Sequence, residues 1–288
     1  MTGIIHKYEI AIIIPAYNEA RVIGETLRTI AGGKPVFPDH WQVLVAANGC
    51  RDDTIAMVRD CGLNCVLLDI VDASKPNALR TAAAMVDAPV TVVMDADIRL
   101  SVDNLEKLIK PLQEGDAERP VAAIGSMKSD ISASSWLVRL FYEVWQHNPY
   151  FEQGKFGGCY ALTSSGMAVL LAMPDVINDD EYIARSVAKI GRVASSDAIF
   201  MTNAPRTLKE LYHVRTRIKR GNRQLYDMRL GNDGSFARKR YRRFLRKVLC
   251  KPSLWLAFLV YTAVNAMACL SARQSKHHLG RWERAERV

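Results

Sequence analysis

Short apolar runs alternate with amphipathic segments through the first hundred residues of the chain. The runs are rich in β-branched residues and end at Pro, Gly, Asn or Asp, which predicts buried strands. We place them at 10–14, 43–47, 65–68 and 90–94, with helices at 20–30, 54–61 and 76–86, where apolar side chains recur at helical spacing. Strands and helices that alternate with short links favour an α/β fold with a doubly wound, mostly parallel sheet.

Length and composition leave two domain arrangements open. A chain of 288 residues can bury a sizeable core as one large α/β domain or as two small ones. With 49% hydrophobic and 24% charged residues, it is globular, neither disordered nor a multi-span membrane protein. The six cysteines show no CxxC pair and no zinc-finger spacing, which predicts reduced thiols in a cytoplasmic protein. No signal peptide precedes the first strand, which also favours the cytoplasm.

Two carboxylates follow directly after the strand at 90–94. Asp95 and Asp97 are one residue apart, and side chains at i and i+2 of an extended segment point to the same face. They can therefore converge on one cation, and hard oxygen ligands suit Mg²⁺ or Mn²⁺. The carboxyl ends of strands are also where open α/β sheets bind their ligands. The alternative is an Asp-rich turn without a ligand.

Four motifs occur in order before residue 100, and together they resemble those of family-2 glycosyltransferases of the GT-A fold. The motifs are Ile14-Pro15-Ala16-Tyr17-Asn18-Glu19, the stretch 47–54 (ANGCRDDT), Lys75-Pro76-Asn77-Ala78-Leu79, and Asp95-Ala96-Asp97. The resemblance covers the first half of the chain closely and residues 8–225 more loosely. It implies a nucleotide-diphospho-sugar donor, a divalent cation (Mg²⁺ or Mn²⁺) on Asp97 and Asp95, and an inverting transfer.

By the same resemblance, nine residues are expected to bind the nucleotide sugar. These are Pro15, Ala16, Tyr17, Glu19, Asn48, Asp52, Lys75, Asp95 and Ala96. Tyr17 offers a flat face for a nucleobase or packs at the rim, and Asn48 offers a donor and an acceptor. Ala47 and Asn48 stand where the family commonly has an acidic pair, which leaves the base open. Asp52 contacts the ligand or caps a helix, and Lys75 neutralises diphosphate or is solvated.

An acidic cluster at 179–181 supplies candidates for the catalytic base. It lies at the predicted start of a helix, where the helix dipole favours negative charge, so a capping role is the alternative. The segment resembles the family motif that carries the base, which points to Asp180 first and Asp179 second. Packing several carboxylates together raises the pKa of one of them, which suits a base that accepts the proton of an acceptor hydroxyl.

Two later segments are candidates for the acceptor and diphosphate sites. The aromatic stretch 136–150 either stacks on sugars or forms core, because its residues recur at helical spacing. Arg217 and Arg220 lie in a basic stretch that resembles the motif following the catalytic acid in processive and lipid-linked members, and they are expected to bind diphosphate. The Gln and Trp of the fuller motif are absent here, which argues against processive polymerisation. A solvated basic helix face is the alternative.

The positive charge of the chain is concentrated near its C-terminal end. The net charge is +9, yet residues 206–251 hold 16 Lys and Arg against three acids, so the remainder is slightly acidic. The basic amphipathic stretch 238–251 predicts contact with anionic lipid. Residues 253–270 carry no charge and would form a helix about 27 Å long, which is marginal for crossing a bilayer. A membrane-lying or re-entrant helix, a single span, and a helix packed on the catalytic domain therefore all stay open.

These observations divide the chain into four predicted parts. Residues 1–125 are expected to bind the nucleotide sugar, 126–235 to bind the acceptor and carry the catalytic acid, 236–272 to associate with the membrane, and 273–288 to form a basic tail held in the cytoplasm. The predicted activity is a metal-dependent glycosyltransferase at the cytoplasmic face of the membrane, acting on a lipid-linked or polysaccharide acceptor in cell-envelope or exopolysaccharide synthesis.

The sequence leaves three alternative functions to compare with this one. A membrane-associated scaffold could bind a nucleotide sugar without turnover. Nucleotidyl transfer to a sugar phosphate normally needs a Gly-rich phosphate loop near the N-terminus, and Pro15-Ala16-Tyr17 is not such a loop. A nucleic-acid partner is not expected, because the basic segment contains no recognisable reading motif.

Overall fold

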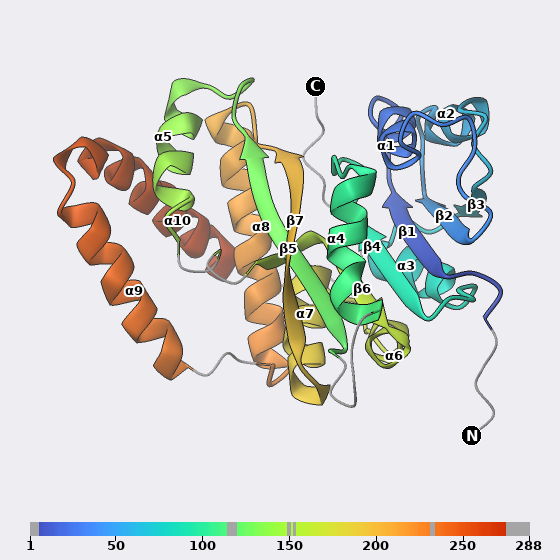
Figure 1. Cartoon of the computed structure of the whole chain (residues 1–288). Coiled ribbons are helices and arrows are strands. Elements are labelled where there is room, and N and C mark those ends of the chain that lie inside the picture. Colours follow the sequence, from blue (N-terminus) through green and yellow to red (C-terminus); the bar gives the residue numbers. More distant parts are fainter. Residues whose placement is uncertain (1–5, 114–119, 149–150, 152–153, 231–233, 275–288) are drawn as a thin grey trace. The chain divides into compact units, whose positions relative to one another are not determined.

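The computed structural model describes residues 6–113, 120–148, 151, 154–230 and 234–274, and these fall into two compact units (Figure 1). The first unit comprises Met1–Lys128, Gly154–Asp175 and Asp179–Thr202, and the second Ser129–Gln153, Val176–Asn178 and Asn203–Val288. The predicted basic tail lies outside the described residues from 275 onward.

A seven-stranded sheet of order β3-β2-β1-β4-β6-β5-β7 organises the first unit. Its strands are β1 (Ile10–Ala16), β2 (Trp41–Asn48), β3 (Val66–Ile70), β4 (Val90–Met94), β5 (Ala122–Asp130), β6 (Lys155–Thr163) and β7 (Val193–Asn203). Strands β1 to β4 pair in parallel, and β6 pairs antiparallel with both β4 and β5. The predicted α/β fold with a doubly wound, mostly parallel sheet is thus confirmed, with β6 inserted beside β4.

Strands β1 and β4 are buried on both faces, as expected of strands in the middle of a parallel sheet. The strand predicted at 90–94 has the observed bounds, whereas β1 continues past Ile14, where Pro15 was predicted to end it. The pairing of β1 with β4 stops at Ile13, and Pro15 pairs only with β2. Proline is tolerated there because β4 no longer needs its missing N–H group.

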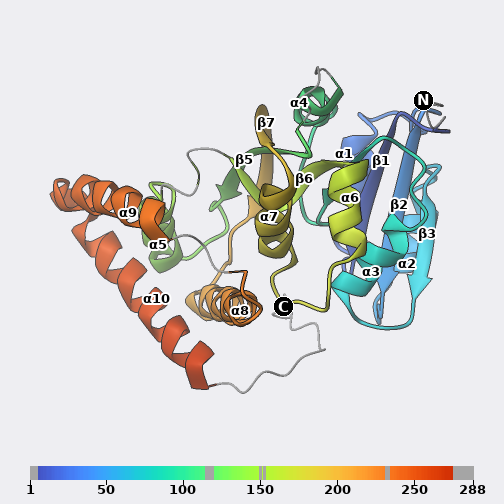
Figure 2. The same ribbon diagram turned by 90° about the horizontal axis from the view of Figure 1, so that it is seen from below.

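Helices cover both faces of the sheet. They are α1 (Ile23–Ile30), α2 (Thr54–Asp60), α3 (Lys75–Ala83), α4 (Val102–Gln113), α6 (Ser164–Leu171) and α7 (Asp179–Ile190). Helix α1 contacts α2 and α4, and α6 contacts α3 and α7. Figure 2 shows α4 on one side of the sheet and α3, α6 and α7 on the other. One large core joins α1 and α4 to alternate residues of the central strands, such as Ile12 and Val92.

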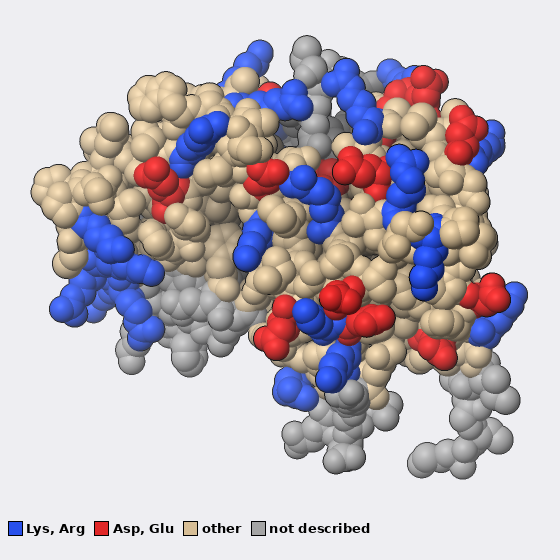
Figure 3. Space-filling model, turned by 45° about the horizontal axis from the view of Figure 1, so that its top comes forward, with Lys and Arg blue, Asp and Glu red and all other residues tan. Residues whose placement is uncertain are grey.

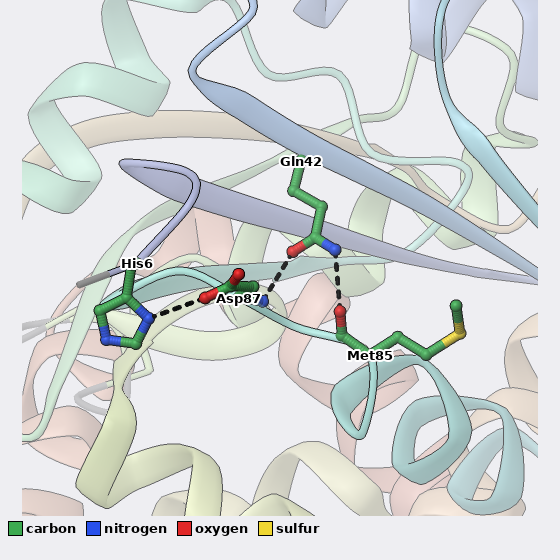
Figure 4. A network of polar contacts seen from close by, with 4 residues as sticks. All are labelled: His6, Gln42, Met85 and Asp87. Carbon is green, nitrogen blue, oxygen red and sulfur yellow. Dashed lines mark hydrogen bonds and ion pairs between the residues drawn. The ribbon is translucent and has the colours of Figure 1, made fainter. Parts of the chain in front are cut away.

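A small polar network fixes the edge of the sheet at which β1, β2 and β4 begin (Figure 4). His6 Nδ1 lies 3.2 Å from Asp87 Oδ1, and the Asp87 backbone N–H donates to Gln42 Oε1 at 2.9 Å. Gln42 Nε2 in turn donates to the Met85 carbonyl at 2.8 Å. The link between α3 and β4 is therefore tied to β2, which helps to hold the parallel strands in register.

The second unit is mainly helical. It contains α5 (Trp136–Trp145), α8 (Leu208–Asp227), α9 (Gly234–Leu249), the short 3₁₀ helix η2 (Pro252–Leu254) and α10 (Trp255–Gln274). One apolar core joins α5, α8, α9 and α10 and contains Phe141, Phe244 and Tyr261. The Phe141 and Tyr261 rings lie 5.0 Å apart, centroid to centroid. Of the two predictions for the aromatic stretch 136–150, core packing therefore accounts for Phe141, whereas Trp136 is exposed.

Candidate functional site

The turn after β4 holds Asp95, Ala96 and Asp97. The Asp95 N–H donates to the Gly158 carbonyl of β6 at 2.7 Å, and the Ala96 carbonyl accepts the Thr26 hydroxyl at 2.7 Å. Ala96 is buried, whereas Asp95 and Asp97 are both partly exposed. The backbone is thus anchored on two sides, and two carboxylates lie at the carboxyl end of a central strand.

Lys75 joins this turn to the acidic start of α7. Helix α3 begins at Lys75, and the hydroxyl of Ser74 accepts a hydrogen bond from the Asn77 N–H, which fixes the first turn. The Lys75 Nζ lies 2.7 Å from Asp95 Oδ1 and 2.8 Å from Asp179 Oδ2. Three segments that are far apart in the sequence, each predicted to carry a site residue, therefore meet at one ammonium group.

Carboxyl groups outnumber the lysine that bridges them in this cluster. Burial disfavours the charged form of Lys75, but the carboxylates of Asp179, Asp95 and Asp180 outweigh it, and the pKa of the ammonium stands well above its ordinary value. Burial raises the pKa of Asp95; Lys75 opposes this, while Asp179 and Asp97 raise it further. One lysine bridges two members of a group of four neighbouring carboxyls, so the cluster favours additional positive charge.

Asp180 lies in the first turn of α7, beside Asp179. Burial and then the Asp179 carboxylate raise the pKa of Asp180 from 3.8 to about 8, against the opposing effect of Lys75. Its carboxyl forms no hydrogen bond or ion pair with another described residue, whereas the neighbouring Glu181 pairs with Arg185 at 2.9 Å. A carboxyl that is free of such partners and has a pKa near neutrality has the properties of a general base.

The carboxylates after β4 fit a divalent cation. Gly158 has a φ of +83°, and a Cβ at this position would lie 2.9 Å from Asp95 Oδ2, so only glycine leaves the space beside that oxygen open. Among the residues that the structure describes, no group of three or more His, Cys, Asp or Glu side chains forms a complete cage. Two neighbouring carboxylates suit Mg²⁺ or Mn²⁺, because these ions take their remaining ligands from water and phosphate.

The predicted nucleotide-binding residues of β1 and β2 lie side by side at the carboxyl end of these strands. Ala16 pairs with Ala47 in the parallel register, and the Asn48 Nδ2 donates to the Ala16 carbonyl at 2.9 Å. Asn48 is 0% exposed, and its Oδ1 has no hydrogen-bond partner in the described part of the chain. In this conformation Asn48 ties the two strand ends together; Tyr17, which follows β1, is partly exposed.

Asp52 joins the loop after β1 to the start of α2. Its Oδ2 accepts the Ala20 N–H and its Oδ1 accepts the N–H of Thr54, the first residue of α2, each at 3.1 Å. The Thr54 hydroxyl accepts the N–H of Glu19, which is 4% exposed. Glu19 and Asp52 therefore belong to one network that holds the loop after β1 against the loop after β2.

Two residues near the acid cluster were not among the predicted site residues. Lys155, at the start of β6, lowers the pKa of Asp180, although less than Lys75 does. Tyr160 is 0% exposed, and its hydroxyl has no hydrogen-bond partner among the described residues. Burial and then the carboxylates of Asp180 and Asp179 raise the pKa of Tyr160 well above its ordinary value, so it stays a neutral phenol. The nearby pair Gly157-Gly158 lies within the same strand, β6.

The two predicted diphosphate ligands belong to the second unit. Arg217 and Arg220 lie on α8, both partly exposed. Helix α8 is also tied to the segment that precedes Asp179. Asn222 Oδ1 accepts from Asn178 Nδ2, and Gln224 Oε1 accepts the Ile177 N–H, each at 2.9 Å. The diphosphate role of the two arginines stays a prediction.

Comparison with known sequences identifies relatives of the first half of the chain. The family model described as "Glycosyl transferase family 2" matches residues 11–167. The chain is 28% identical over 124 residues to glycosyltransferase AglD of Haloferax volcanii, covering 41% of this chain and 19% of AglD. It is 22% identical over 121 residues to an undecaprenyl-phosphate 4-deoxy-4-formamido-L-arabinose transferase of Enterobacter sp., covering 40% of this chain and 37% of that protein. The matches span less than half of the length of these curated relatives.

Solved structures show the same fold. The mannosyltransferase PcManGT of Pyrobaculum calidifontis, in complex with GDP-Man and Mn²⁺, matches with a TM-score of 0.60 at 21% identity and covers 94% of this chain and 77% of its own. Glucosyl-3-phosphoglycerate synthase of Mycobacterium tuberculosis, in complex with Mn²⁺, UDP and glucosyl-3-phosphoglycerate, matches with a TM-score of 0.53 at 17% identity and covers 79% and 82%. The predicted GT-A type of sheet is thereby confirmed.

Proposed function

Because the chain belongs to glycosyl transferase family 2, we propose that it transfers a sugar from a nucleotide-diphospho-sugar to a lipid-linked or polysaccharide acceptor, with inversion at the anomeric carbon. The donor class is supported by the GDP-Man and UDP held by two proteins of the same fold. The lipid-linked acceptor is supported by a relative named for undecaprenyl phosphate. The observation that carries the proposal is Lys75, which joins the carboxylates after β4 to those at the start of α7.

The donor site is proposed to lie at the carboxyl ends of β1, β2 and β4. Tyr17 would stack on the base, and the tied loops after β1 and β2 would shape its pocket. A divalent cation held by Asp95 and Asp97 would neutralise charge on the leaving diphosphate. Lys75 would add a further positive charge, and Arg217 and Arg220 of α8 would bind the diphosphate oxygens through their planar guanidinium groups.

Asp180 is proposed as the general base. As the bond from the anomeric carbon to the diphosphate oxygen breaks, the acceptor oxygen bonds to that carbon from the opposite side, which inverts the configuration. Asp180 would take the proton of the acceptor hydroxyl, and its raised pKa makes it a stronger base than an ordinary carboxylate. Asp179, which holds Lys75, would position the cluster.

The proposed location is the cytoplasmic face of a membrane, where polyprenyl-linked sugars would be assembled for the cell envelope or an exopolysaccharide. All six cysteines are free thiols, which suits a reducing compartment. Residues Pro252–Gln274 form one helix that is long and apolar enough to cross a bilayer, by length and composition only.

A donor screen would test the proposal. Thermal shift with a panel of nucleotide-diphospho-sugars, in Mn²⁺ and again with chelator, should identify one base and sugar that stabilise the protein only when the cation is present. The same donor should then release nucleoside diphosphate when a polyprenyl-linked saccharide, whose sugar hydroxyl is the nucleophile, is added in detergent. Asp97→Asn should abolish the cation-dependent shift, while Asp39→Asn, an exposed acid in the loop before β2, should leave it unchanged.

Two outcomes would overturn the proposal. A donor that binds but releases no nucleoside diphosphate with any lipid-linked or saccharide acceptor would favour a nucleotide-sugar-binding scaffold. Full transfer activity in Asp180→Asn would show that another group, or none, acts as the base.

A further inference from the structure

Helix α10 has two different apolar faces. Ala257, Tyr261, Val264, Ala268 and Ala272 recur every three or four residues and are buried against the second unit. On the opposite side, large apolar side chains are exposed at Trp255, Leu256, Leu259, Met267 and Leu270. Only 22% of the most apolar window of this helix is buried. Most of a helix whose one charged residue, Arg273, lies in its last turn is therefore left facing outward.

The inner face of α10 is fixed along its length. Tyr261 and Val264 share the apolar core with α5, α8 and α9. Asn265 Oδ1 accepts from Arg215 Nη2 of α8 at 2.8 Å, and near the end of α10 the Arg273 carbonyl accepts from Arg223 Nη1 at 3.4 Å. Helix α10 thus belongs to the folded unit and is not a separate apolar segment.

Positive charge borders the exposed apolar face. Between residues 234 and 274 there are nine Lys and Arg and no Asp or Glu. Five of the nine have described, exposed side chains on α9 or just after it, namely Arg242, Arg243, Arg246, Lys247 and Lys251. In Figure 3, Lys and Arg side chains gather over α9 at the left of the view. The Nε1 of Trp255, at the junction of the two helices, donates to the Leu249 carbonyl at 3.1 Å.

These contacts decide between crossing the bilayer and lying on it. If α10 crossed the bilayer with its core intact, α8 would enter the hydrocarbon together with Arg217, Lys219 and Arg220, where each charge is costly. If α10 left the unit in order to cross alone, the core would lose one wall and Arg215 would lose its amide partner. Only the outer face of α10 can meet lipid without either loss.

We propose that α10 is an in-plane membrane-docking helix: its exposed face enters the headgroup and acyl boundary of an anionic bilayer, while the basic residues of α9 bind the lipid headgroups. Trp255 would lie at the interface, as aromatic residues commonly do. Anionic lipid is the occupant that the charges favour, because a second copy of this chain would bring equally basic surfaces together. The proposal does not depend on glycosyl transfer.

Flotation with preformed vesicles tests the docking surface on the full chain. The protein should float with phosphatidylglycerol/phosphatidylcholine vesicles and bind pure phosphatidylcholine at least ~10-fold more weakly. Leu256→Glu with Leu259→Glu should reduce binding to the anionic vesicles by ~10-fold or more. Leu171→Glu with Ile190→Glu places the same two changes on exposed apolar residues of the first unit, and should bind like the unaltered protein. All variants should keep the far-ultraviolet circular dichroism and the Tm of the unaltered protein.

Depth measurements separate docking from crossing. In a background that keeps only the buried Cys159, a fluorophore is placed in turn at positions 256, 259, 267 and 270, and is quenched by lipids that carry nitroxides at different depths. In-plane docking predicts one common shallow depth for all four. A depth that increases toward the middle of the helix and decreases again would show a span and overturn the proposal.

Failure to bind anionic vesicles, combined with concentration-dependent dimers that the Leu256/Leu259 variant abolishes, would identify a second copy as the occupant and overturn the proposal equally.

Discussion

The two units of this protein bury charge in opposite ways. In the first, Asp95, Asp179 and Asp180 gather around Lys75, and burial together with mutual repulsion raises the pKa of Asp180 to about 8. In the second, Arg215 is 8% exposed and is held by neutral groups. Its guanidinium lies 4.5 Å from the Trp145 ring centroid, and Asn265 accepts two of its N–H groups.

This difference distinguishes a candidate ligand site, the acid cluster, from a structural contact, the surroundings of Arg215. The carboxyls of the first unit are close enough to repel one another, and a cation or a proton would relieve that repulsion. Arg215 has two acceptor contacts and an aromatic face, and it needs no ligand to stay buried. Buried charge alone is therefore a poor guide to function; the imbalance of charge in the first unit is what marks a candidate site.

Among the variants, Asp180→Asn is expected to reduce activity most strongly. Asparagine keeps the size of the side chain but cannot accept the proton, so the rate of transfer should fall by about 10³-fold, while the KM for the donor changes little. The measurement is nucleoside-diphosphate release under saturating donor and acceptor. A rate close to that of the unaltered enzyme would make the acid cluster structural, like the Arg215 site.

Lys75→Met removes a cation that bridges two of the acids. The change should lower the free energy of unfolding by about 3 kcal/mol, because Asp95 and Asp179 then lose the ammonium group that both contact. Chemical denaturation in chelator measures it, and Lys107→Met, an exposed lysine of α4, serves as the control. Added Mn²⁺ should restore part of the lost stability. If Lys75→Met and Lys107→Met were equally stable, Lys75 would not be needed to balance the charge of the buried carboxylates.

Arg215→Ala tests the second unit. The loss of two hydrogen bonds and of the ring contact should lower the free energy of unfolding by about 2 kcal/mol. Unlike Lys75→Met, this variant should recover no stability with Mn²⁺, because the groups that contact Arg215, Asn265 and the Trp145 ring, are neutral. Lys209→Ala on the exposed side of α8 gives the baseline for losing a basic side chain from this helix. If Mn²⁺ restored the stability of Arg215→Ala, the two units would not differ in how they hold buried charge.

Local sequence patterns predicted the helices and strands of the parallel half of the sheet. They did not predict which strands pair when the partners are far apart in the sequence. The run 90–94 has the predicted bounds, because its apolar residues are buried on both faces. The helix predicted at 20–30 begins only at Ile23, since Asn18 adopts a φ of 54° and the Thr54 hydroxyl holds the Glu19 N–H before the helix starts. No local pattern shows that β6 runs antiparallel between β4 and β5, because strand neighbours follow from topology.

The candidate site was likewise predictable only where its residues are neighbours in the sequence. The spacing of Asp95 and Asp97 was sufficient to place both carboxylates after one strand. The acidic start of α7 was visible as a cluster, but its proximity to Asp95 through Lys75 depends on how β4, α3 and α7 meet. Tyr160 left no signal, because a buried tyrosine in an apolar strand has the sequence signature of core. Asn48 was visible as a polar residue at a strand end, yet its burial followed only from the pairing of β1 with β2.

The dependence of stability on pH gives the smallest and most specific test. The pKa of Asp180 is about 8 in the folded protein and near 3.8 in the unfolded chain, so the folded state binds this proton more tightly. Between these values the folded state holds more protons, and this group makes the protein less stable as the pH rises. Asp180→Asn removes that penalty. In metal-free buffer its Tm should exceed that of the unaltered protein by a few degrees above pH 8, and the difference should shrink steadily toward pH 5. A Tm difference independent of pH would mean that the Asp180 carboxyl titrates as it does in water, and the first unit would then bury its charge no differently from the second.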